Sequence, residues 1–237
     1  MTLQTELADG VLTFRLARPE RLNAIDETTA RALLEALRGA ETSAGVRVIV
    51  LRGNGRAFCA GRDISEAPTP QILTLVQDVS RAIVVSAKPV IAVVHGWVVG
   101  AGVEWMLDAD IVVAARSARF RLPEIGLGVF VTGGITRTLP ACAGLARAKG
   151  LLLLGEEFSA ADAERWGLVW SVVDDDALDA EAARIAARLA SLDPAALGRF
   201  KRVLNEMNLA GFEEALVTEA RMQTELEGMA GQGEPGR

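Results

Sequence analysis

The chain has 237 residues, of which 50% are hydrophobic and 24% charged, and its formal net charge is −6 at pH 7. These values predict a globular protein with a substantial core. They argue against nucleic acid as a partner, because no strongly basic stretch is present and aromatic residues make up only 5% of the chain.

The cysteines indicate the cellular compartment, and the longest apolar stretch indicates whether the chain spans a membrane. Cys59 and Cys142 lack the spacing of a disulfide framework or a metal site, so we expect two buried thiols in a reducing, cytoplasmic setting. No basic, apolar leader is visible in the first ten residues. The apolar region 82–115 is interrupted by Lys88 and other polar residues, so no membrane span is expected.

The first half of the chain alternates strand and helix patterns. Residues 3–7 and 11–16 alternate apolar and polar side chains around Asp9-Gly10, which predicts a hairpin. A helix is then predicted over 27–41, a buried strand over 46–53, a loop up to 65 and a second helix over 69–86. Beyond it we predict strands over 89–96, 110–115 and 118–124, with a short helix over 100–107.

The second half is mainly helical. Gly133-Gly134 introduces helices through residue 154, and 158–173 predicts a short helix and a strand. Amphipathic helices follow over 176–192, 194–207 and 212–228, and the glycine-rich tail 229–237 is expected to be disordered. Strands and helices that alternate with short connections predict a layered α/β fold.

Several common catalytic arrangements are missing. The chain has one histidine, no tyrosine, no Gly-x-Ser-x-Gly motif and no phosphate-binding lysine loop, which argues against a triad, a multi-histidine metal site and nucleotide hydrolysis. His95 follows a buried strand, so we expect a core histidine bonded to the backbone. A dinucleotide site after the 89–96 strand has weak support, because Trp105 occupies the third glycine position of that motif.

Two glycine-containing loops point to another kind of site. FCAGRD (58–63) and VGAGVE (99–104) each follow a strand, and the second opens a helix. Glycine removes side-chain obstruction, so each loop can present free backbone N–H groups. Two such donors that converge on one point would form an oxyanion hole.

Two carboxylates accompany these loops. The neighbours of Glu104 are apolar, so a buried acid/base group is a better interpretation than a solvated first-turn glutamate. Glu124 follows Pro123, and its spacing alone leaves two interpretations equally open: an acid/base group or a helix-start residue.

Ordered matches over nearly the whole chain resemble the crotonase, or enoyl-CoA hydratase/isomerase, superfamily. The matching segments are RPERLNAID (18–26), GRAFCAGRDISE (55–66), KPVIAVVHGWVVGAGVEWMLDADIVVAA (88–115), FRLPEIGLGVFVTGG (120–134) and AERWGLV (163–169). The resemblance implies a spiral of ββα units over 1–190, a helical C-terminal region over 191–228 that mediates trimerisation, and a homotrimer or homohexamer.

The resemblance also implies an acyl-CoA thioester substrate, and no separate cofactor, since coenzyme A is part of that substrate. The oxyanion hole would come from the N–H groups of Arg62 and Ala101, and the hydratase carboxylates would be Glu104 and Glu124. The implied coenzyme A contacts are Leu22, Ala24, Ala60, Gly61, Asp63, Ile64 and Gly100. The Arg62 side chain either contacts a coenzyme A phosphate, closes over the pocket, or is a solvated loop arginine.

The implied activity is that of a hydro-lyase, the reversible syn-addition of water to a trans-2-enoyl-CoA. Retention of both glutamates favours it, because many relatives with other reactions keep only one. Alternatives are a Δ3,Δ2-enoyl-CoA isomerase, a dehydratase of a specialised acyl-CoA, and a silent acyl-CoA-binding subunit whose early chain end leaves the pocket incomplete. Phe130, Val131 and Thr132 stand where short-chain hydratases carry smaller residues, which implies a differently shaped pocket.

Overall fold

The chain opens with the hairpin that Asp9-Gly10 predicts. In the computed structural model, which describes residues 1–65 and 69–230, β1 (Leu3–Ala8) pairs antiparallel with β2 (Val11–Leu16). Asp9 and Gly10 have φ angles of 50° and 79°. Two successive positive φ angles suit the tight turn whose twist matches that of paired strands, and the predicted hairpin is confirmed.

The described strands form two sheets. The larger sheet has the order β1-β2-β3-β5-β7-β10, in which every pairing from β2 onward is parallel. The smaller sheet has the order β4-β6-β8-β9. The further strands are β3 (Val48–Gly53), β4 (Ala57–Cys59), β5 (Val90–Val94), β6 (Trp97–Val99), β7 (Ile111–Ala115), β8 (Arg119–Arg121), β9 (Glu157–Ser159) and β10 (Ser171–Val173).

Successive ββα units build both sheets at once. In each unit the first strand (β3, β5 or β7) joins the larger sheet, the second (β4, β6 or β8) joins the smaller one, and a helix follows. Parallel neighbours in a sheet need such a crossover, because a two-residue turn cannot join them. The chain therefore winds as the expected spiral, and the predicted α/β fold class is confirmed.

Three strands of the smaller sheet, β4, β6 and β9, were not predicted, and β9 begins one residue before the predicted helix-and-strand segment 158–173. β4 lies inside the expected loop, and β6 lies between the expected strand and helix. Three residues are too few for a pattern of alternation, and tertiary pairing decides instead: Ala57 pairs with Trp97, and Cys59 with Val98. β8 is shorter than the predicted 118–124, because a helix begins at Glu124.

The first three α-helices follow the predictions closely. They are α1 (Glu27–Thr42), α2 (Pro70–Val85) and α3 (Ala101–Asp108). The Asp26 carboxylate accepts from the N–H of Thr29, and the Thr69 hydroxyl accepts from that of Ile72, so polar caps fix the first two helix starts. The next helical segments are η1 (Pro19–Arg21), α4 (Glu124–Leu127), α5 (Ile135–Ala143), α6 (Leu145–Leu154), α7 (Ala160–Arg165) and η2 (Asp175–Ala177).

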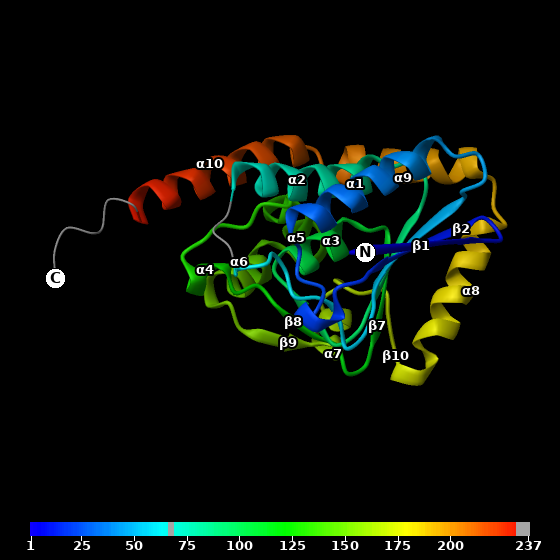
Figure 1. Ribbon diagram of the computed structural model, residues 1–237, viewed down its shortest axis with the longest axis horizontal. Coiled ribbons are helices and arrows are strands. Elements are labelled where there is room, and N and C mark those ends of the chain that lie inside the picture. The colour runs from blue at the N-terminus through cyan, green and yellow to red at the C-terminus, as the bar shows by residue number, and fades with distance from the viewer. Residues whose placement is uncertain (66–68, 231–237) are drawn as a thin grey trace.

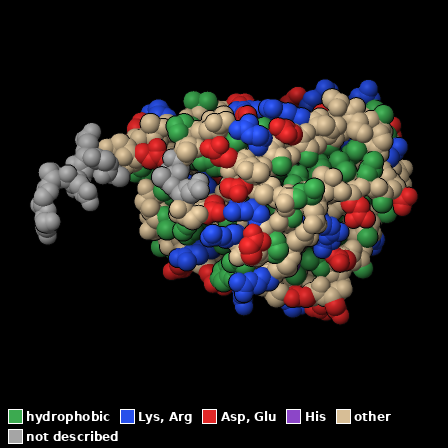
Figure 2. All heavy atoms as spheres, in the orientation of Figure 1, with side chains coloured by type: hydrophobic (Ala, Val, Ile, Leu, Met, Phe, Trp, Pro, Cys, Tyr) green, Lys and Arg blue, Asp and Glu red, His purple; other side chains and the backbone are tan. Residues whose placement is uncertain are grey.

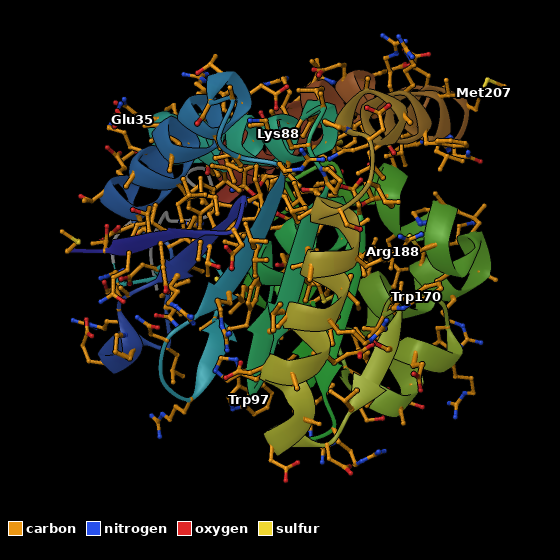
Figure 3. The ribbon with its side chains drawn as sticks, turned by 90° about the vertical axis from the view of Figure 1, so that its right-hand side faces the viewer. Glu35, Lys88, Trp97, Trp170, Arg188 and Met207 are labelled. Atoms are coloured by element: carbon orange, nitrogen blue, oxygen red, sulfur yellow. The ribbon has the colours of Figure 1, made fainter. Side chains whose placement is uncertain are left out.

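The last helices lie on two sides of the molecule. α8 (Leu178–Ala190) covers the outer face of the larger sheet, where Ala182 and Ile185 pack in a cluster with Val50 and Ile91 (Figure 3). α9 (Pro194–Asn208) and α10 (Phe212–Ala230) run along the same side as α1 and α2, and α10 packs against α5 (Figure 1). α10 ends two residues beyond the predicted 228, and residues 231–237 of the expected tail lie outside the described part of the chain.

Charges of both signs are interspersed on the face shown in Figure 2, where no large basic area appears. Over the residues that the structure describes, no helix is long and apolar enough to cross a membrane.

The histidine and one of the cysteines differ from expectation. The His95 Nε2 donates to the carbonyl of Gly55 at 2.8 Å, so the predicted backbone bond is confirmed, but the residue is half-buried rather than in the core. Cys59 is buried as predicted, and burial raises the pKa of its thiol to about 12. The prediction of a buried Cys142 is wrong, because it lies at the exposed end of α5, where the helix leaves the core.

Candidate active site

Two glycine loops meet at the end of the smaller sheet. Gly61 follows β4, and Gly100 follows β6 and caps α3. A Cβ built on Gly61 would lie 2.8 Å from the Val99 oxygen and 3.6 Å from the Ala101 nitrogen. One built on Gly100 would lie 3.9 Å from the Gly61 Cα. Because β4 and β6 are parallel neighbours, their ends bring both loops to one place.

The two loops leave backbone donors available there. Gly61 and Gly100 have positive φ angles of 83° and 51°, which turn the chain before Arg62 and Ala101. Within the described residues, the N–H groups of Arg62 and Ala101 donate no hydrogen bond to another protein group. Ala101 is also the first residue of α3, where the helix dipole adds partial positive charge. The pair has the chemistry of an oxyanion hole.

Glu104 lies in the first turn of α3, which begins at Ala101. It is 1% exposed, and its Oε1 accepts from the N–H of Thr132 at 3.0 Å. Burial, followed by the like charges of Glu124 and Glu219, holds the pKa of this carboxyl well above its ordinary value, while the Thr132 bond opposes the shift. The glutamate is therefore buried, as the apolar neighbours in the sequence predicted.

Glu124 is the first residue of α4 and also faces the same space. A Cβ at Gly100 would lie 2.6 Å from its Oε1, so the absence of a side chain at Gly100 makes room for this carboxylate. Burial raises the pKa of Glu124 to about 7, while its own backbone N–H and the Arg62 guanidinium oppose that shift. The helix-start interpretation is confirmed, since Glu124 begins α4, and the acid/base interpretation stays a prediction for a carboxyl that lines the cavity.

The charges of Glu104 and Glu124 are coupled. A charge on one disfavours a charge on the other, because both face one poorly solvated space. Arg62 favours the charged form of Glu124, whereas Glu104 is more deeply buried and has the further like charge of Glu219 nearby. Both carboxyls therefore have raised pKa values, and only that of Glu124 has a nearby cation that opposes the shift.

All four groups line one cavity of about 180 Å³. Its polar part consists of the two glutamates and the glycine loops. Its other walls are apolar side chains from the loop after β4, from α2 and from the segment after α4, namely Ile64, Leu73, Val76, Leu127, Val129 and Phe130. A reactive polar end and an apolar wall suit a substrate with a carbonyl group at one end of an aliphatic or aromatic chain.

The residues assigned to coenzyme A contacts fall into two groups. Ala60, Gly61, Ile64 and Gly100 line the cavity, and Leu22, Ala24 and Asp63 do not. Asp63 belongs to the first glycine loop, and the segment with Leu22 and Ala24 is bonded to that loop: the N–H of Ala60 donates to the Leu22 oxygen at 3.0 Å, and that of Asp63 to the Ile25 oxygen at 2.8 Å.

Asp63 and Arg62 have different surroundings. The Asp63 carboxylate is 3.1 Å from the Arg18 Nη2 and accepts from the hydroxyl of Ser65 at 2.7 Å, so it holds the loop in shape. Burial lowers the pKa of the half-buried Arg62, and the nearby charges of Glu227 and Glu124 oppose that shift. It is therefore not a freely solvated loop arginine.

Sequence reasoning missed two residues that build this site. Arg18 donates to the Ala24 oxygen at 2.6 Å besides its ion pair with Asp63, and it joins the first motif to the oxyanion loop. Gln223 of α10 lines the cavity and is 1% exposed. The sequence could have indicated that Gln223 is buried, because Gln223 continues the helical stripe that contains the buried Phe212 and Leu216.

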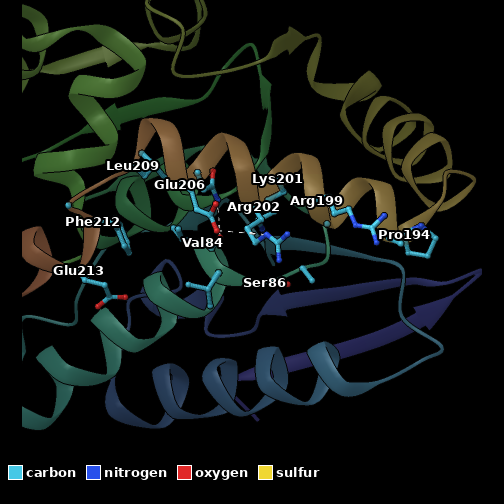
Figure 4. Close-up of a pocket in the computed structure, with 16 residues that line it drawn as sticks. Val84, Ser86, Pro194, Arg199, Lys201, Arg202, Glu206, Leu209, Phe212 and Glu213 are labelled. Atoms are coloured by element: carbon cyan, nitrogen blue, oxygen red, sulfur yellow. Dashed lines mark hydrogen bonds and ion pairs between the residues drawn. The ribbon is translucent and has the colours of Figure 1, made fainter.

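A larger cavity, of about 710 Å³, lies away from these groups, between the end of α2, α9 and the start of α10 (Figure 4). Its charged side chains, among them Arg199, Arg202 and Glu206, are on its rim helices, and no pair of buried carboxyls faces it. Among the described residues no group of three or more His, Cys, Asp or Glu side chains could hold a metal ion.

Comparison with known proteins agrees with this geometry. The enoyl-CoA hydratase/isomerase family matches residues 6–231. The chain is 40% identical to 1,2-epoxyphenylacetyl-CoA isomerase of Escherichia coli over 83% of this chain and 79% of that protein, and 33% identical to 2,3-dehydroadipyl-CoA hydratase of the same organism over 91% and 86%.

Among solved structures, an enoyl-CoA hydratase from Mycobacterium avium subsp. paratuberculosis superposes with a TM-score of 0.91 at 33% identity, covering 95% of this chain and 90% of that one. The sequence motifs, the ββα spiral and these matches lead to one conclusion: the chain belongs to the enoyl-CoA hydratase/isomerase family, the crotonase superfamily.

Proposed function

We propose that this protein is an enoyl-CoA hydratase, a hydro-lyase that adds water reversibly to a trans-2-enoyl-CoA. One observation carries the proposal: Glu104 and Glu124 face the same cavity as the N–H groups of Arg62 and Ala101, which donate to no other protein group in the described part of the chain. An isomerase needs one group to move a proton, whereas hydration needs one group to activate water and one to deliver a proton.

The proposed reaction uses each of these groups. The thioester oxygen accepts from the N–H groups of Arg62 and Ala101, which draws electrons from the conjugated double bond. The water oxygen bonds to the β-carbon as one carboxylate takes its proton, and the double-bond electrons move to form an enolate. The other carboxyl, which is protonated at the start, delivers its proton to the α-carbon as the carbonyl re-forms. The two carboxyls have then exchanged protonation states, and proton exchange with solvent restores the starting state. Because both carboxyls line the same cavity, we expect them to act on one face of the double bond, which gives syn addition.

The walls of the cavity support an acyl chain that is itself apolar. Arg62 is the only cation among its described lining residues, and Glu124 lies nearby. A second carboxylate at the far end of the acyl chain would therefore find apolar side chains rather than a cation. We assign the thioester end to Gly61, Gly100 and the loop from Ala60 to Ile64, with Leu22 and Ala24 behind it. The reaction needs no cofactor beyond the coenzyme A of its substrate.

A second candidate is an isomerase that moves the double bond of a 3-enoyl-CoA into conjugation. It is favoured by the relative of 40% identity, which is named an isomerase, and either carboxyl alone could move the proton. A dehydratase of a specialised acyl-CoA would use the same two groups in the reverse direction. A silent acyl-CoA-binding subunit is disfavoured, because both carboxyls and both donors are in place.

We also propose that the chain assembles as a homotrimer or a dimer of trimers, and that residues 191–228 supply the contact. The support is a stripe of large exposed apolar side chains on α9 at helical spacing, made of Phe200, Val203, Leu204 and Met207, which are 51–74% exposed. This set is called the α9 stripe below. Sedimentation velocity of the purified chain measures the assembly directly.

The activity is tested with crotonyl-CoA and with a 3-enoyl-CoA, by following the absorbance of the conjugated thioester. Loss of absorbance from crotonyl-CoA is the expected result and indicates hydration. Gain of absorbance from the 3-enoyl substrate, without loss from crotonyl-CoA, would instead identify an isomerase. Binding of acyl-CoA with no change in either assay, at any chain length, would identify a silent subunit.

A further inference from the structure

α10 presents two polar side chains on its buried side. Phe212, Leu216, Glu219 and Gln223 repeat at helical spacing, and their exposed fractions are 5%, 0%, 0% and 1%. The first two are apolar and belong to a packed cluster. A glutamate and a glutamine at the next two positions of such a stripe cost free energy unless their polar atoms are bonded.

Both side chains are bonded to one short segment of backbone. The Glu219 Oε2 accepts from the N–H of Gly134 at 2.7 Å, and its Oε1 accepts from the N–H of Thr136 at 2.8 Å and from its hydroxyl at 2.6 Å. One turn further along α10, the Gln223 Oε1 accepts from the N–H of Phe130 at 2.6 Å. α10 therefore holds the backbone at 130 and again at 134–136.

The middle of the same segment is bonded to Glu104. Every second N–H from 130 to 134 has a side-chain acceptor, and the central one, from Thr132, donates to the Glu104 Oε1 at 3.0 Å. The segment has little room to move. A Cβ on Gly133 would lie 2.7 Å from the Glu104 Oε2, and one on Gly134 would lie 2.2 Å from the Phe212 ring.

We propose that Glu219 and Gln223 are positioning residues for Glu104, because they hold the 130–134 segment from both ends and so keep the Thr132 N–H directed at that carboxyl. Neither residue needs to touch the reacting atoms. The consequence for turnover rests on the proposed function, whereas the placement of the Glu104 carboxyl does not.

The test uses Gln223, because a matched rescue is available in the chain. The Gln223 Nε2 donates to the Oε1 of the exposed Glu227 at 2.7 Å. Gln223→Leu removes the acceptor for the Phe130 N–H. The double variant Gln223→Glu/Glu227→Gln exchanges the two groups, so it keeps an acceptor at 223, a hydrogen bond between 223 and 227, and the same net charge. Glu214→Gln, exposed on the same helix, is the control.

Three quantities are measured for each variant: kcat and KM with crotonyl-CoA, amide hydrogen exchange of the peptide that covers 130–136, and the side-chain carboxyl resonance that disappears in Glu104→Gln. In Gln223→Leu we expect kcat to fall about tenfold, as for the loss of one buried hydrogen bond, with a smaller change in KM. Exchange should rise and the Glu104 resonance should shift. The exchanged pair should restore all three, and Glu214→Gln should change none.

Two results would overturn the proposal: faster exchange in Gln223→Leu without a change in the Glu104 resonance or in kcat, or a loss of activity and folding that the exchanged pair fails to restore. A different result would separate it from the proposed function. If the wild type hydrates no enoyl-CoA, yet its Glu104 resonance moves in Gln223→Leu and returns in the exchanged pair, the positioning role is supported and the hydratase assignment is lost.

Discussion

Two cavities of the molecule differ in size and in the polar groups that face them, and the smaller of the two has the converging polar groups. The larger one, at about 710 Å³, lies beside α9, and the smaller one, at about 180 Å³, lies between the two glycine loops. Most charged groups of the larger cavity sit on solvent-facing helix surfaces, and the buried one, Lys201, is paired with Asp110 at 2.8 Å. The smaller cavity has two buried carboxyls with raised pKa values, and two backbone N–H groups that donate to no protein group among the described residues.

This difference shows that the candidate active site is identified by the polar groups that converge on a cavity and not by the volume of the cavity. A buried carboxyl costs free energy, and the smaller cavity contains two. The α9 stripe lies on the helix that walls the larger cavity, which suits an interface with another copy of the chain. Changes in the smaller cavity should therefore alter turnover, and changes around the larger one should alter assembly.

Glu104→Gln should have the largest effect of all. The amide has the same shape but cannot take or give the proton, so we expect kcat to fall by about two or more orders of magnitude. Steady-state kinetics with crotonyl-CoA measure it, and Glu206→Gln in the larger cavity is the matched control. Near-normal turnover in Glu104→Gln would remove this residue from the mechanism.

Gly61→Ala should come next. Its φ of 83° disfavours any side chain, and the new Cβ would lie 2.8 Å from the Val99 oxygen, so the loop must shift and carry the Arg62 N–H with it. Loss of one oxyanion donor lowers kcat by about a hundredfold or more. The control is Gly39→Ala in α1, where a Cβ meets no atom within 4 Å. An unchanged kcat in Gly61→Ala would mean that this donor is not used.

Much of this architecture was predictable from local patterns. The hairpin, the first three α-helices and the buried strands follow from turn chemistry, polar caps and apolar runs that are local in the chain. The glycine loops were recognisable for the same reason, since a positive φ at Gly61 or Gly100 is a local demand on the residue type. That both loops meet depended on parallel pairing of strands too short to be predicted.

The parts that escaped prediction depend on contacts between distant segments. β4 and β6 exist because each pairs with the other, and no pattern within three residues could indicate it. Gln223 lies 93 positions beyond Phe130, whose N–H it accepts. Its place on a buried stripe could have shown that it is bonded, but not to which segment. Cys142 is exposed for a similar reason, because its surroundings are set by where α5 leaves the core.

The pH dependence of activity should report on Glu124 more than on any residue of the larger cavity. Burial raises its pKa to about 7, and kcat/KM reflects groups of the free enzyme, so kcat/KM should rise as the pH passes about 7 and Glu124 becomes a base. Glu124→Gln should remove that limb. A limb that already ends near the ordinary carboxyl value of 4.5 would show that the pKa of Glu124 is not raised in the free enzyme.

The same shift predicts how stability changes with pH. A carboxyl whose pKa is higher in the folded state binds its proton more tightly there, so its contribution to the free energy of unfolding is complete below 4.5 and is lost as the pH rises through about 7. Denaturant unfolding of the wild type and of Glu124→Gln, below and above this window, measures it. Relative to the wild type, the variant should gain stability toward higher pH.

Phe200→Glu in the α9 stripe should have the smallest effect on turnover and a clear effect on assembly. Phe200 is 72% exposed, so the substitution costs little in the isolated chain, but a charge inside an apolar contact would weaken the assembly. Sedimentation velocity should show smaller species, whereas Ala183→Glu on the exposed side of α8 should not. The kcat per chain should stay near the wild-type value, because both carboxyls and both oxyanion donors come from one chain. A fall in kcat that follows dissociation would show that a neighbouring copy completes the smaller cavity, and the separation of the two cavities into chemistry and assembly would then fail.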